Sequence, residues 1–352
     1  RRQRQMCIRD RANISPNPIF FMNKSLSKNL NQCSVLSNNN PIIDLIVPNE
    51  LAGERLDVAL AKLLPQYSRS RLASWIKKGA VTVNRSPSIA KHKLIGTEQI
   101  KIICDATPEE TSFQPQFIHL DIIHEDTHLL VLNKPVDLVV HPASGNWSHT
   151  LLNGLLHYHQ ELHHLPRAGI VHRLDKNTSG LMVVAKTLET QTDLVKQLQA
   201  RAIKRLYRAI TLGIVPYDGS IRNQIGRHPY TRTKMAVLST GGKEAITHIQ
   251  VLKRFKQHSY IECSLETGRT HQIRVHMQQA GYPLVGDSIY GGTLRLTDNE
   301  QLNSALRTID RQMLHAYQLH FIHPITNEKL SFQADLPLDM QYLLDILYKE
   351  EA

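Results

Sequence analysis

The stretch that decides the fold is residues 172–180, HRLDKNTSG. Apolar segments flank it on both sides, 168–171 (AGIV) and 181–185 (LMVVA), and both are typical of short buried strands. The pattern therefore predicts that Asp175 lies on a polar loop between rigid elements, where functional carboxylates are often found. A plain hairpin turn is the alternative, because Asp, Asn, Ser and Gly are frequent in turns for local reasons.

Further stretches accompany this loop along the chain. They are 126–142 (DTHLLVLNKPVDLVVHP), 204–209 (KRLYRA), 267–276 (TGRTHQIRVH), 283–287 (PLVGD), 314–316 (LHA) and 323–324 (HP). Together with the loop, they resemble the RluA/RluD family of pseudouridine synthases over roughly residues 45–350. That family usually has Gly where this chain has Asp137, a departure that concerns a turn and leaves the chemistry untouched.

The resemblance implies an enzyme that isomerises uridine in RNA to pseudouridine without a cofactor. It implies Asp175 as the catalytic carboxylate, Tyr207 as the ring that stacks on the target base, and Arg274 as the active-site cation, with Arg269 as runner-up. A carboxylate in a partly dry pocket needs such a cation, because burial raises an Asp pKa and a nearby Arg lowers it. Without the resemblance, Tyr207 would be interpreted as an aromatic residue of the core, and Arg274 as a member of a structural ion pair.

Three roles for Asp175 stay open at this point. It could attack the sugar at C1′, add to the base at C6, or remove the C2′ proton to give a glycal. All three need an ionised Asp175, so none is favoured by the residues alone.

The segment that precedes the catalytic motifs predicts two helices followed by two strands, over 53–64, 70–78, 81–84 and 99–103. Ser68 or Ser70 could cap the second helix, and Gly79 would end it. This order resembles an S4 RNA-binding module, which the family often has at this place. It implies RNA contacts from basic residues on the second helix, namely Arg69, Arg71, Lys77 and Lys78. The alternative is that these residues form a solvated basic face.

Basic residues near the catalytic motifs are further candidates for RNA contacts. Arg173 could act as a wedge or phosphate clamp for a base that leaves its stack, or be a solvated arginine. Arg269 is a second candidate. Residues 221–243 read as a polar, loop-rich insertion near the substrate, or else as an ordinary exposed loop. Its candidates for RNA contacts are Arg227, His228, Arg232 and Lys234.

The fold class expected is α+β, with an N-terminal S4 RNA-binding module and a catalytic domain on a long, mostly antiparallel mixed sheet. In that domain, helices are expected over 190–202 and 339–348. Met22 is a candidate start. The expected boundaries are a disordered or non-native extension over 1–44, the S4 module over 45–105, a linker over 106–115 and the catalytic domain over 116–352.

Composition agrees with a polyanionic partner. The 352 residues have a net charge of +11, but residues 1–40 hold seven Lys or Arg and one acidic residue, so the rest is only mildly basic. Four scattered cysteines and unclustered histidines predict neither a metal site nor a disulfide framework, as in a reducing cytoplasm. No dinucleotide or Walker motif and no run of membrane-spanning length is present.

These features favour an enzyme that acts on large-subunit (23S) ribosomal RNA, with the uridines of the helix 69 stem-loop as the expected target. We expect it to be cytoplasmic and monomeric. The alternatives are a pseudouridine synthase for another ribosomal or transfer RNA uridine, and a non-catalytic ribosome-assembly factor that has kept the fold.

Overall fold

The computed structural model describes residues 42–104, 112–143, 145–231, 233–292 and 296–351. The chain divides into two compact units, one up to residue 107 and one from residue 108. The expected extension over 1–44 and linker over 106–115 lie largely outside the described residues, so their character stays a prediction.

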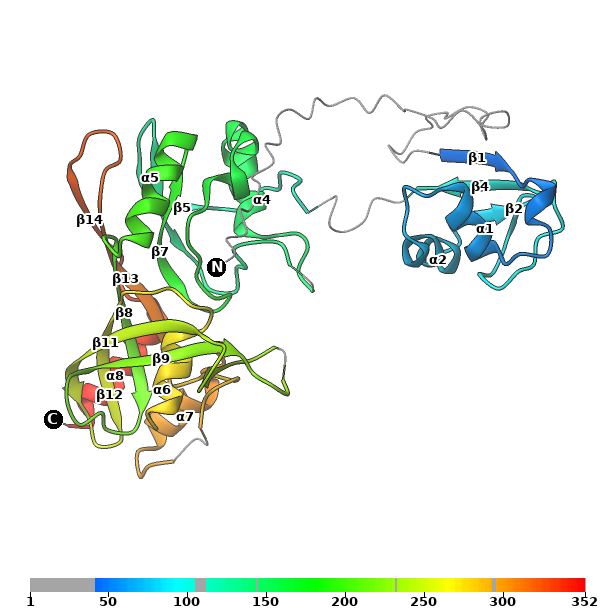
Figure 1. Ribbon diagram of the computed structural model, residues 1–352. Coiled ribbons are helices and arrows are strands. Elements are labelled where there is room, and N and C mark those ends of the chain that lie inside the picture. Colours follow the sequence, from blue (N-terminus) through cyan, green and yellow to red (C-terminus); the bar gives the residue numbers. More distant parts are fainter. Residues whose placement is uncertain (1–41, 105–111, 144, 232, 293–295, 352) are drawn as a thin grey trace, which may run out of the picture. The chain divides into compact units, whose positions relative to one another are not determined.

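The first unit is a four-stranded antiparallel sheet with two helices packed on it (Figure 1). Strand order is β1-β4-β2-β3. Strand β1 begins at Ile42, so regular structure starts earlier than the residue 45 expected from the sequence. The elements are β1 (Ile42–Ile46), η1 (Asn49–Leu51), α1 (Leu56–Leu63), α2 (Arg69–Lys77), β2 (Val81–Val83), β3 (Ser86–Pro87) and β4 (Gln99–Ile103).

Both helices of the first unit form where the apolar spacing predicts them. Leu56 and Leu60 of α1 are fully buried, as is Leu72 of α2, so each helix turns one face to the core. The Ser68 hydroxyl caps α2 by accepting a hydrogen bond from the Arg71 N–H at 3.3 Å. Gly79 follows the helix with φ +78°, a left-handed conformation that glycine adopts without strain.

The second unit is built on a ten-stranded sheet in the order β10-β9-β11-β12-β8-β13-β7-β6-β5, with β14 paired to β13. Neighbouring strands are antiparallel except β7 and β13, which are parallel. This mixed sheet confirms the α+β class. Its strands are β5 (Asp121–Glu125), β6 (Leu129–Lys134), β7 (Ser179–Ala185), β8 (Lys204–Leu212), β9 (Gly219–Arg227), β10 (Met235–Leu238), β11 (Lys243–Arg254), β12 (His258–Leu265), β13 (Leu314–Ile322) and β14 (Lys329–Gln333).

Helices accompany both halves of this sheet. Figure 1 shows α4 and α5 beside β5 and β7, and α6, α7 and α8 beside β8–β12. No helix within the described ranges is long and apolar enough to cross a membrane. The helices are α4 (Leu151–Tyr158), α5 (Leu188–Gln199), α6 (Gln272–Gln279), α7 (Glu300–Thr308) and α8 (Leu338–Lys349), with the 3-10 turns η2 (Gln160–His164) and η3 (Pro166–Gly169).

Strand β7 is a rigid support for the loop that contains Asp175, because both faces of the strand are buried. Met182 and Val184 pack in the core that contains α4, whereas Leu181 and Val183 pack in the core that contains Leu194 of α5. A continuous apolar run therefore suits this central strand, as the sequence predicts.

The strand expected over 168–171 is wrong. A 3-10 turn, Pro166–Gly169, occupies its first half, and only Ile170 makes an isolated bridge, to Val184. Two consecutive left-handed residues follow the proline, which suits a tight turn and not an extended strand. A Cβ on Gly169 would overlap the backbone of Ala185, so the turn packs directly against β7.

The loop-rich insertion expected over 221–243 is also wrong. Strands β9 and β10 pair antiparallel through this region, with Arg227 opposite Met235. Its residues are polar because β10 is the end strand of the sheet and β9 exposes alternate side chains.

A substitution at Gly180 tests whether strands β7 and β13 must approach each other closely at this position. It has φ +118°, and a Cβ there would overlap the backbone of Ala316. We expect Gly180→Ala to lower the melting temperature of the protein by roughly 5–10 °C, from a strain of about 2–3 kcal/mol. Gly219→Ala in β9, where a Cβ meets nothing, is the control. Equal melting temperatures for the two variants would contradict the close approach.

The buried side chain of His258 predicts how the stability of the protein depends on pH. It is 2% exposed, and burial lowers its pKa to about 4. An unfolded chain binds the proton near pH 6.5, so stability is lost as the pH falls from about 6.5 to about 4. We expect His258→Phe to flatten the dependence of the melting temperature on pH in this window. An unchanged slope would mean that His258 is not held neutral.

Candidate active site

Asp175 lies on the loop between η3 and β7. Its carbonyl accepts a hydrogen bond from the Thr178 N–H at 3.1 Å, which closes a turn just before the strand begins. The Asp175 side chain is 16% exposed. It lines a cavity of about 840 Å³, large enough for a nucleotide-sized ligand, whose walls also include His172, Arg173, Arg205, Tyr207, Gly268, Arg269, His271 and Arg274.

A buried lysine fixes the backbone on one side of this loop. Lys134, at the end of β6, is 0% exposed, and its Nζ donates to the carbonyls of Pro135 at 2.6 Å, Leu138 at 2.9 Å and Lys176 at 3.0 Å. Burial lowers the pKa of Lys134 to about 7, while the charge of Asp175 acts in the opposite direction. Three carbonyls match the three hydrogens of an ammonium, so Lys134 ties the loop that contains Asp175 to β6.

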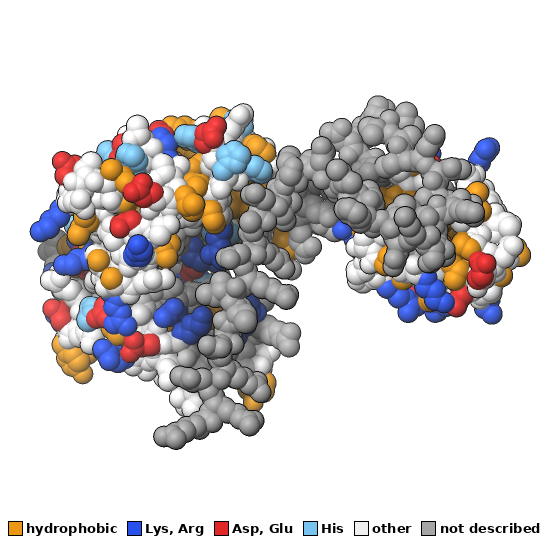
Figure 2. Space-filling view, turned by 45° about the horizontal axis from the view of Figure 1, so that its top comes forward, with side chains coloured by type: hydrophobic (Ala, Val, Ile, Leu, Met, Phe, Trp, Pro, Cys, Tyr) orange, Lys and Arg blue, Asp and Glu red, His pale blue; other side chains and the backbone are white. Residues whose placement is uncertain are grey.

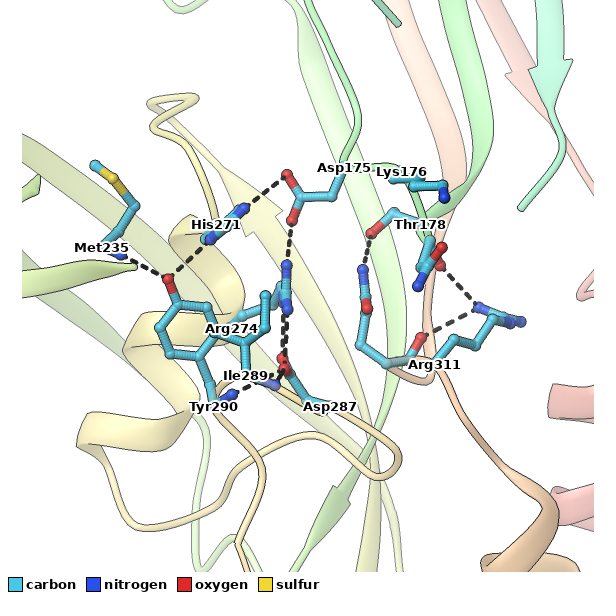
Figure 3. A network of polar contacts seen from close by, with 12 residues as sticks. Asp175, Lys176, Thr178, Met235, His271, Arg274, Asp287, Ile289, Tyr290 and Arg311 are labelled. Carbon is cyan, nitrogen blue, oxygen red and sulfur yellow. Dashed lines mark hydrogen bonds and ion pairs between the residues drawn. The ribbon is translucent and has the colours of Figure 1, made fainter. Parts of the chain in front are cut away.

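Arg311 and Gln312, which precede β13, bind the other side of the loop. Arg311 donates to the carbonyl of Asn177 at 3.3 Å, and Gln312 donates to the Thr178 hydroxyl at 3.0 Å (Figure 3). Arg311 is itself fixed by a bidentate pair with Asp339. Segments far apart in the sequence thus converge on one short loop.

Asp137, which replaces the glycine usual in the family, fits its turn. It has φ +61°, a left-handed conformation that Asp tolerates better than most residues. Its carboxylate pairs with Lys176 at 2.9 Å on the surface. The departure therefore adds an exposed contact to the catalytic loop and leaves the cavity unchanged.

Arg274 connects two carboxylates at the centre of the site (Figure 3). Its Nη1 donates to Asp175 Oδ2 at 3.0 Å, while Nε and Nη2 form a bidentate pair with Asp287 at 2.7 and 2.9 Å. The Arg274 side chain is 5% exposed and the Asp287 side chain 0%. The guanidinium is therefore held by Asp287 and presents one remaining edge to Asp175.

Charge compensation explains how this arrangement tolerates burial. Burial lowers the pKa of Arg274, but the bonds and charge of Asp287, together with Asp175, outweigh it and raise the pKa. Burial raises the pKa of Asp287, but Arg274 and the N–H groups of Ile289 and Tyr290 outweigh it and lower the pKa. Both groups are charged at neutral pH.

A second chain of contacts reaches Asp175 through His271. The Tyr290 hydroxyl accepts from the Met235 N–H at 2.7 Å, so its own hydrogen is directed to His271 Nδ1 at 2.8 Å. His271 Nε2 lies 3.9 Å from Asp175 Oδ1 (Figure 3). Burial lowers the pKa of His271, so the imidazole is neutral and places an N–H toward the carboxylate.

Tyr207 lines the same cavity from strand β8. It is 5% exposed, and burial raises its pKa, while the charge of Arg205 lowers it and that of Asp175 raises it. The phenol is therefore protonated at neutral pH. A flat aromatic face next to the carboxylate can stack on a nucleic acid base.

The cavity also contains the two further arginines expected near the catalytic loop. Arg173 is exposed beside Asp175 and lines the opening. Arg269 lines it too, but its Nε donates to the carbonyl of Glu244 at 2.9 Å. Arg274, and not Arg269, contacts Asp175.

The remaining candidates for RNA contacts belong to the region around β9 and to helix α2 of the first unit. Arg227 is exposed at the end of β9, and Arg232 lies outside the described residues. In α2, Arg69 pairs with Asp57 at 2.7 Å, and Arg71 stacks over Tyr67 and Trp75, whereas Lys77 and Lys78 are exposed. Figure 2 shows Lys and Arg interspersed with Asp and Glu on the visible face of the second unit.

Metal ligands do not gather anywhere in the part of the chain that the structure describes: no group of three or more His, Cys, Asp or Glu could hold an ion there. Cys104 and Cys263 are both buried. The other two cysteines, Cys7 and Cys33, lie outside the described ranges.

Comparison with known proteins decides the family. A family model described as RNA pseudouridylate synthase matches residues 128–279, and an S4 domain model matches residues 54–87. A Neisseria meningitidis protein named "Ribosomal large subunit pseudouridine synthase D" is 58% identical over 88% of this chain and 82% of its own length. The chain belongs to the RNA pseudouridylate synthase family. The resemblance seen in the sequence motifs is confirmed.

Other members of the pseudouridylate synthase family agree. Proteins of the same name from Nitrosomonas europaea and Pseudomonas aeruginosa are 49% and 48% identical, over 88% and 86% of this chain and 89% and 95% of their own lengths. The solved structure titled "Human RNA Pseudouridylate Synthase Domain Containing 4" has a TM-score of 0.52 at 25% identity, covering 65% of this chain and 93% of its own. The chain is an RNA pseudouridine synthase with an S4 domain.

Asp287 tests the support of Arg274 in this synthase. We expect Asp287→Asn to slow pseudouridine formation at least tenfold and to lower stability by about 3 kcal/mol, because it breaks a buried ion pair. Melting temperature and conversion rate measure both effects. Glu300→Gln, which removes an exposed pair with Arg307, is the control and should change neither. Full activity in Asp287→Asn would show that Arg274 needs no second carboxylate.

Proposed function

We propose that this synthase converts uridines of large-subunit ribosomal RNA to pseudouridine, with Asp175 as the catalytic residue. The observation that supports the role of Asp175 is its carboxylate, 3.0 Å from a buried guanidinium, in a cavity that also contains Tyr207. The substrate is supported by relatives of 48–58% identity that are named for the large ribosomal subunit.

The reaction needs the base to be detached, turned and rejoined. The N1–C1′ bond breaks, a C5–C1′ bond forms, C5 loses its proton and N1 gains one. Asp175 acts as an ionised group in each of the three roles considered above, which Arg274 favours through a charge-assisted hydrogen bond. Tyr207 would stack on the uracil and, as a neutral phenol, leaves the negative charge of Asp175 undisturbed.

The target base must leave its stack to enter this cavity, at a cost of a few kcal/mol. Arg173 is exposed and lines the cavity, and it would fill the vacated position or bind a phosphate. Arg269 extends the basic wall of the same cavity. Phosphate contacts from exposed Lys77 and Lys78 of the S4 domain, and from Arg227, would add affinity and orientation without reading the sequence.

We infer 23S RNA, with the helix 69 stem-loop, as the target among large-subunit sites, and a monomer in the cytoplasm as the working state. Another ribosomal or transfer RNA uridine is the second candidate for the target. A non-catalytic assembly factor would have no need for a buried cation directed at an otherwise solvent-accessible carboxylate, so the Arg274–Asp175 contact disfavours that alternative.

The proposal is tested with a pseudouridine map of ribosomal and transfer RNA incubated with the protein. We expect conversion confined to helix 69 with the wild type and none with Asp175→Asn, while RNA affinity changes less than about threefold. Asp137→Asn is the matched control, because this carboxylate is 79% exposed and lies outside the cavity.

The outcomes separate the claims. Conversion at other uridines would replace the target and keep the chemistry. Activity that survives in a clean Asp175→Asn variant would remove Asp175 from the mechanism. Tight binding by the wild type without conversion of any free RNA or ribosomal particle would support the assembly factor.

A further inference from the structure

Arg205 is a buried cation of the cavity that the reaction described above does not use. It lies in strand β8, is 8% exposed and lines the cavity. Its Nε is inaccessible to solvent and has no hydrogen-bond partner, and no described residue forms an ion pair with its guanidinium. Arg205 thus differs from Arg274, which two carboxylates neutralise.

An unpaired buried guanidinium lowers the stability of the free protein, because water solvates the charge better than the protein interior does. A ligand that enters the cavity could supply the missing partner. The chain also leaves room for it: a Cβ on Gly268 would lie 2.7 Å from Arg205 Nη1. A larger residue at position 268 would therefore have to displace the end of the Arg205 side chain from its present position.

The position of Arg205 indicates which part of an RNA could reach it. Arg205 and Tyr207 are two residues apart on one strand, so their side chains lie on the same face. They are buried to a similar degree, at 8% and 5% exposed. Arg173, by contrast, is exposed at the opening of the cavity, as expected for a phosphate contact. The group that penetrates to Tyr207 is the flipped base.

Uracil offers a guanidinium two acceptors, the carbonyl oxygens O2 and O4. When the N1–C1′ bond breaks, its electron pair stays on the base and spreads from N1 to these oxygens. Addition of Asp175 to C6 would likewise move electrons onto O4. In each of the three roles of Asp175 the base is more negative in the transition state than in the bound substrate.

We propose that Arg205 binds a carbonyl oxygen of the target uracil and stabilises the negative charge of the detaching base. This inference rests on the proposed function. The charge is fixed before the reaction starts, so no reorganisation is needed when the bond breaks. Arg205 would discriminate the transition state from the substrate, and its loss would affect the rate more than the affinity. When the C5–C1′ bond has formed and C5 has lost its proton, N1 is protonated and the base is neutral again.

The test compares Arg205→Met with the wild type in single-turnover pseudouridine formation on the RNA that the wild type converts. We expect the rate at saturating RNA to fall about 100-fold to 1,000-fold, while the RNA dissociation constant changes less than about threefold. Arg205→Lys keeps the charge without the planar fork, and we expect it to recover roughly tenfold of the loss.

Arg208→Met is the matched control. Arg208 lies on the same strand but on the opposite face, where it pairs with Glu262 at 3.0 Å and stacks over Tyr317. We expect its loss to lower the melting temperature and to leave the rate unchanged. Arg205→Met should lower the rate without lowering the melting temperature. Removing an uncompensated buried charge leaves the free protein as stable as the wild type or more so.

A rate within about threefold of the wild type in Arg205→Met would overturn the proposal. If RNA affinity is weaker while the rate is unchanged, Arg205 contacts a phosphate and not the base, and the proposal is also overturned. A lower melting temperature together with an unchanged rate would indicate a structural role and would also overturn it. If Arg205→Met does not fold, Arg205→Ala with added methylguanidinium decides: restored turnover supports the proposal, and no restoration contradicts it. Failure of the wild type to convert any uridine would instead refute the proposed function.

Discussion

The active site depends on one guanidinium that two carboxylates share. Asp287 accepts hydrogen bonds from Nε and Nη2 of Arg274 in a buried pair, and Asp175 accepts one from Nη1 at the wall of the cavity. A buried arginine without Asp287 would draw Asp175 into a closed structural pair. Because Asp287 carries most of the compensation, the Asp175 carboxylate stays partly exposed at the wall of the cavity.

The architecture of the sheet brings these groups together. Asp175 precedes β7, Tyr207 lies in β8, and β13 lies between these two strands, so the carboxylate and the ring are held on neighbouring parts of one rigid sheet. Helix α6 adds Arg274, and the buried Lys134 ammonium fixes the backbone that follows Asp175. The geometry of the loop is thus determined by contacts to several elements and not by its own turn.

The sequence predicted Asp175, Tyr207 and Arg274 because each lies within a local motif, and the structure places all three at one cavity. The stretch 283–287 drew attention to Asp287 but gave it no role, because the sequence does not show which cation this carboxylate contacts after the turn that follows α6. The strand expected over 168–171 failed for a related reason: apolar residues that pack a tight turn against a strand resemble a strand. Helix α6 was missed because His271 begins it in a left-handed conformation and no capping residue marks its start.

The most direct test is a crystal structure of Asp175→Asn bound to a stem-loop that contains the target uridine. The account predicts a flipped uracil stacked on Tyr207, with its C1′ facing residue 175 and a carbonyl oxygen within hydrogen-bonding distance of Arg205. Arg274 would keep its pair with Asp287 in that complex. A uridine that remains stacked in the RNA, or that enters the cavity with Arg205 bound to phosphate, would contradict the account.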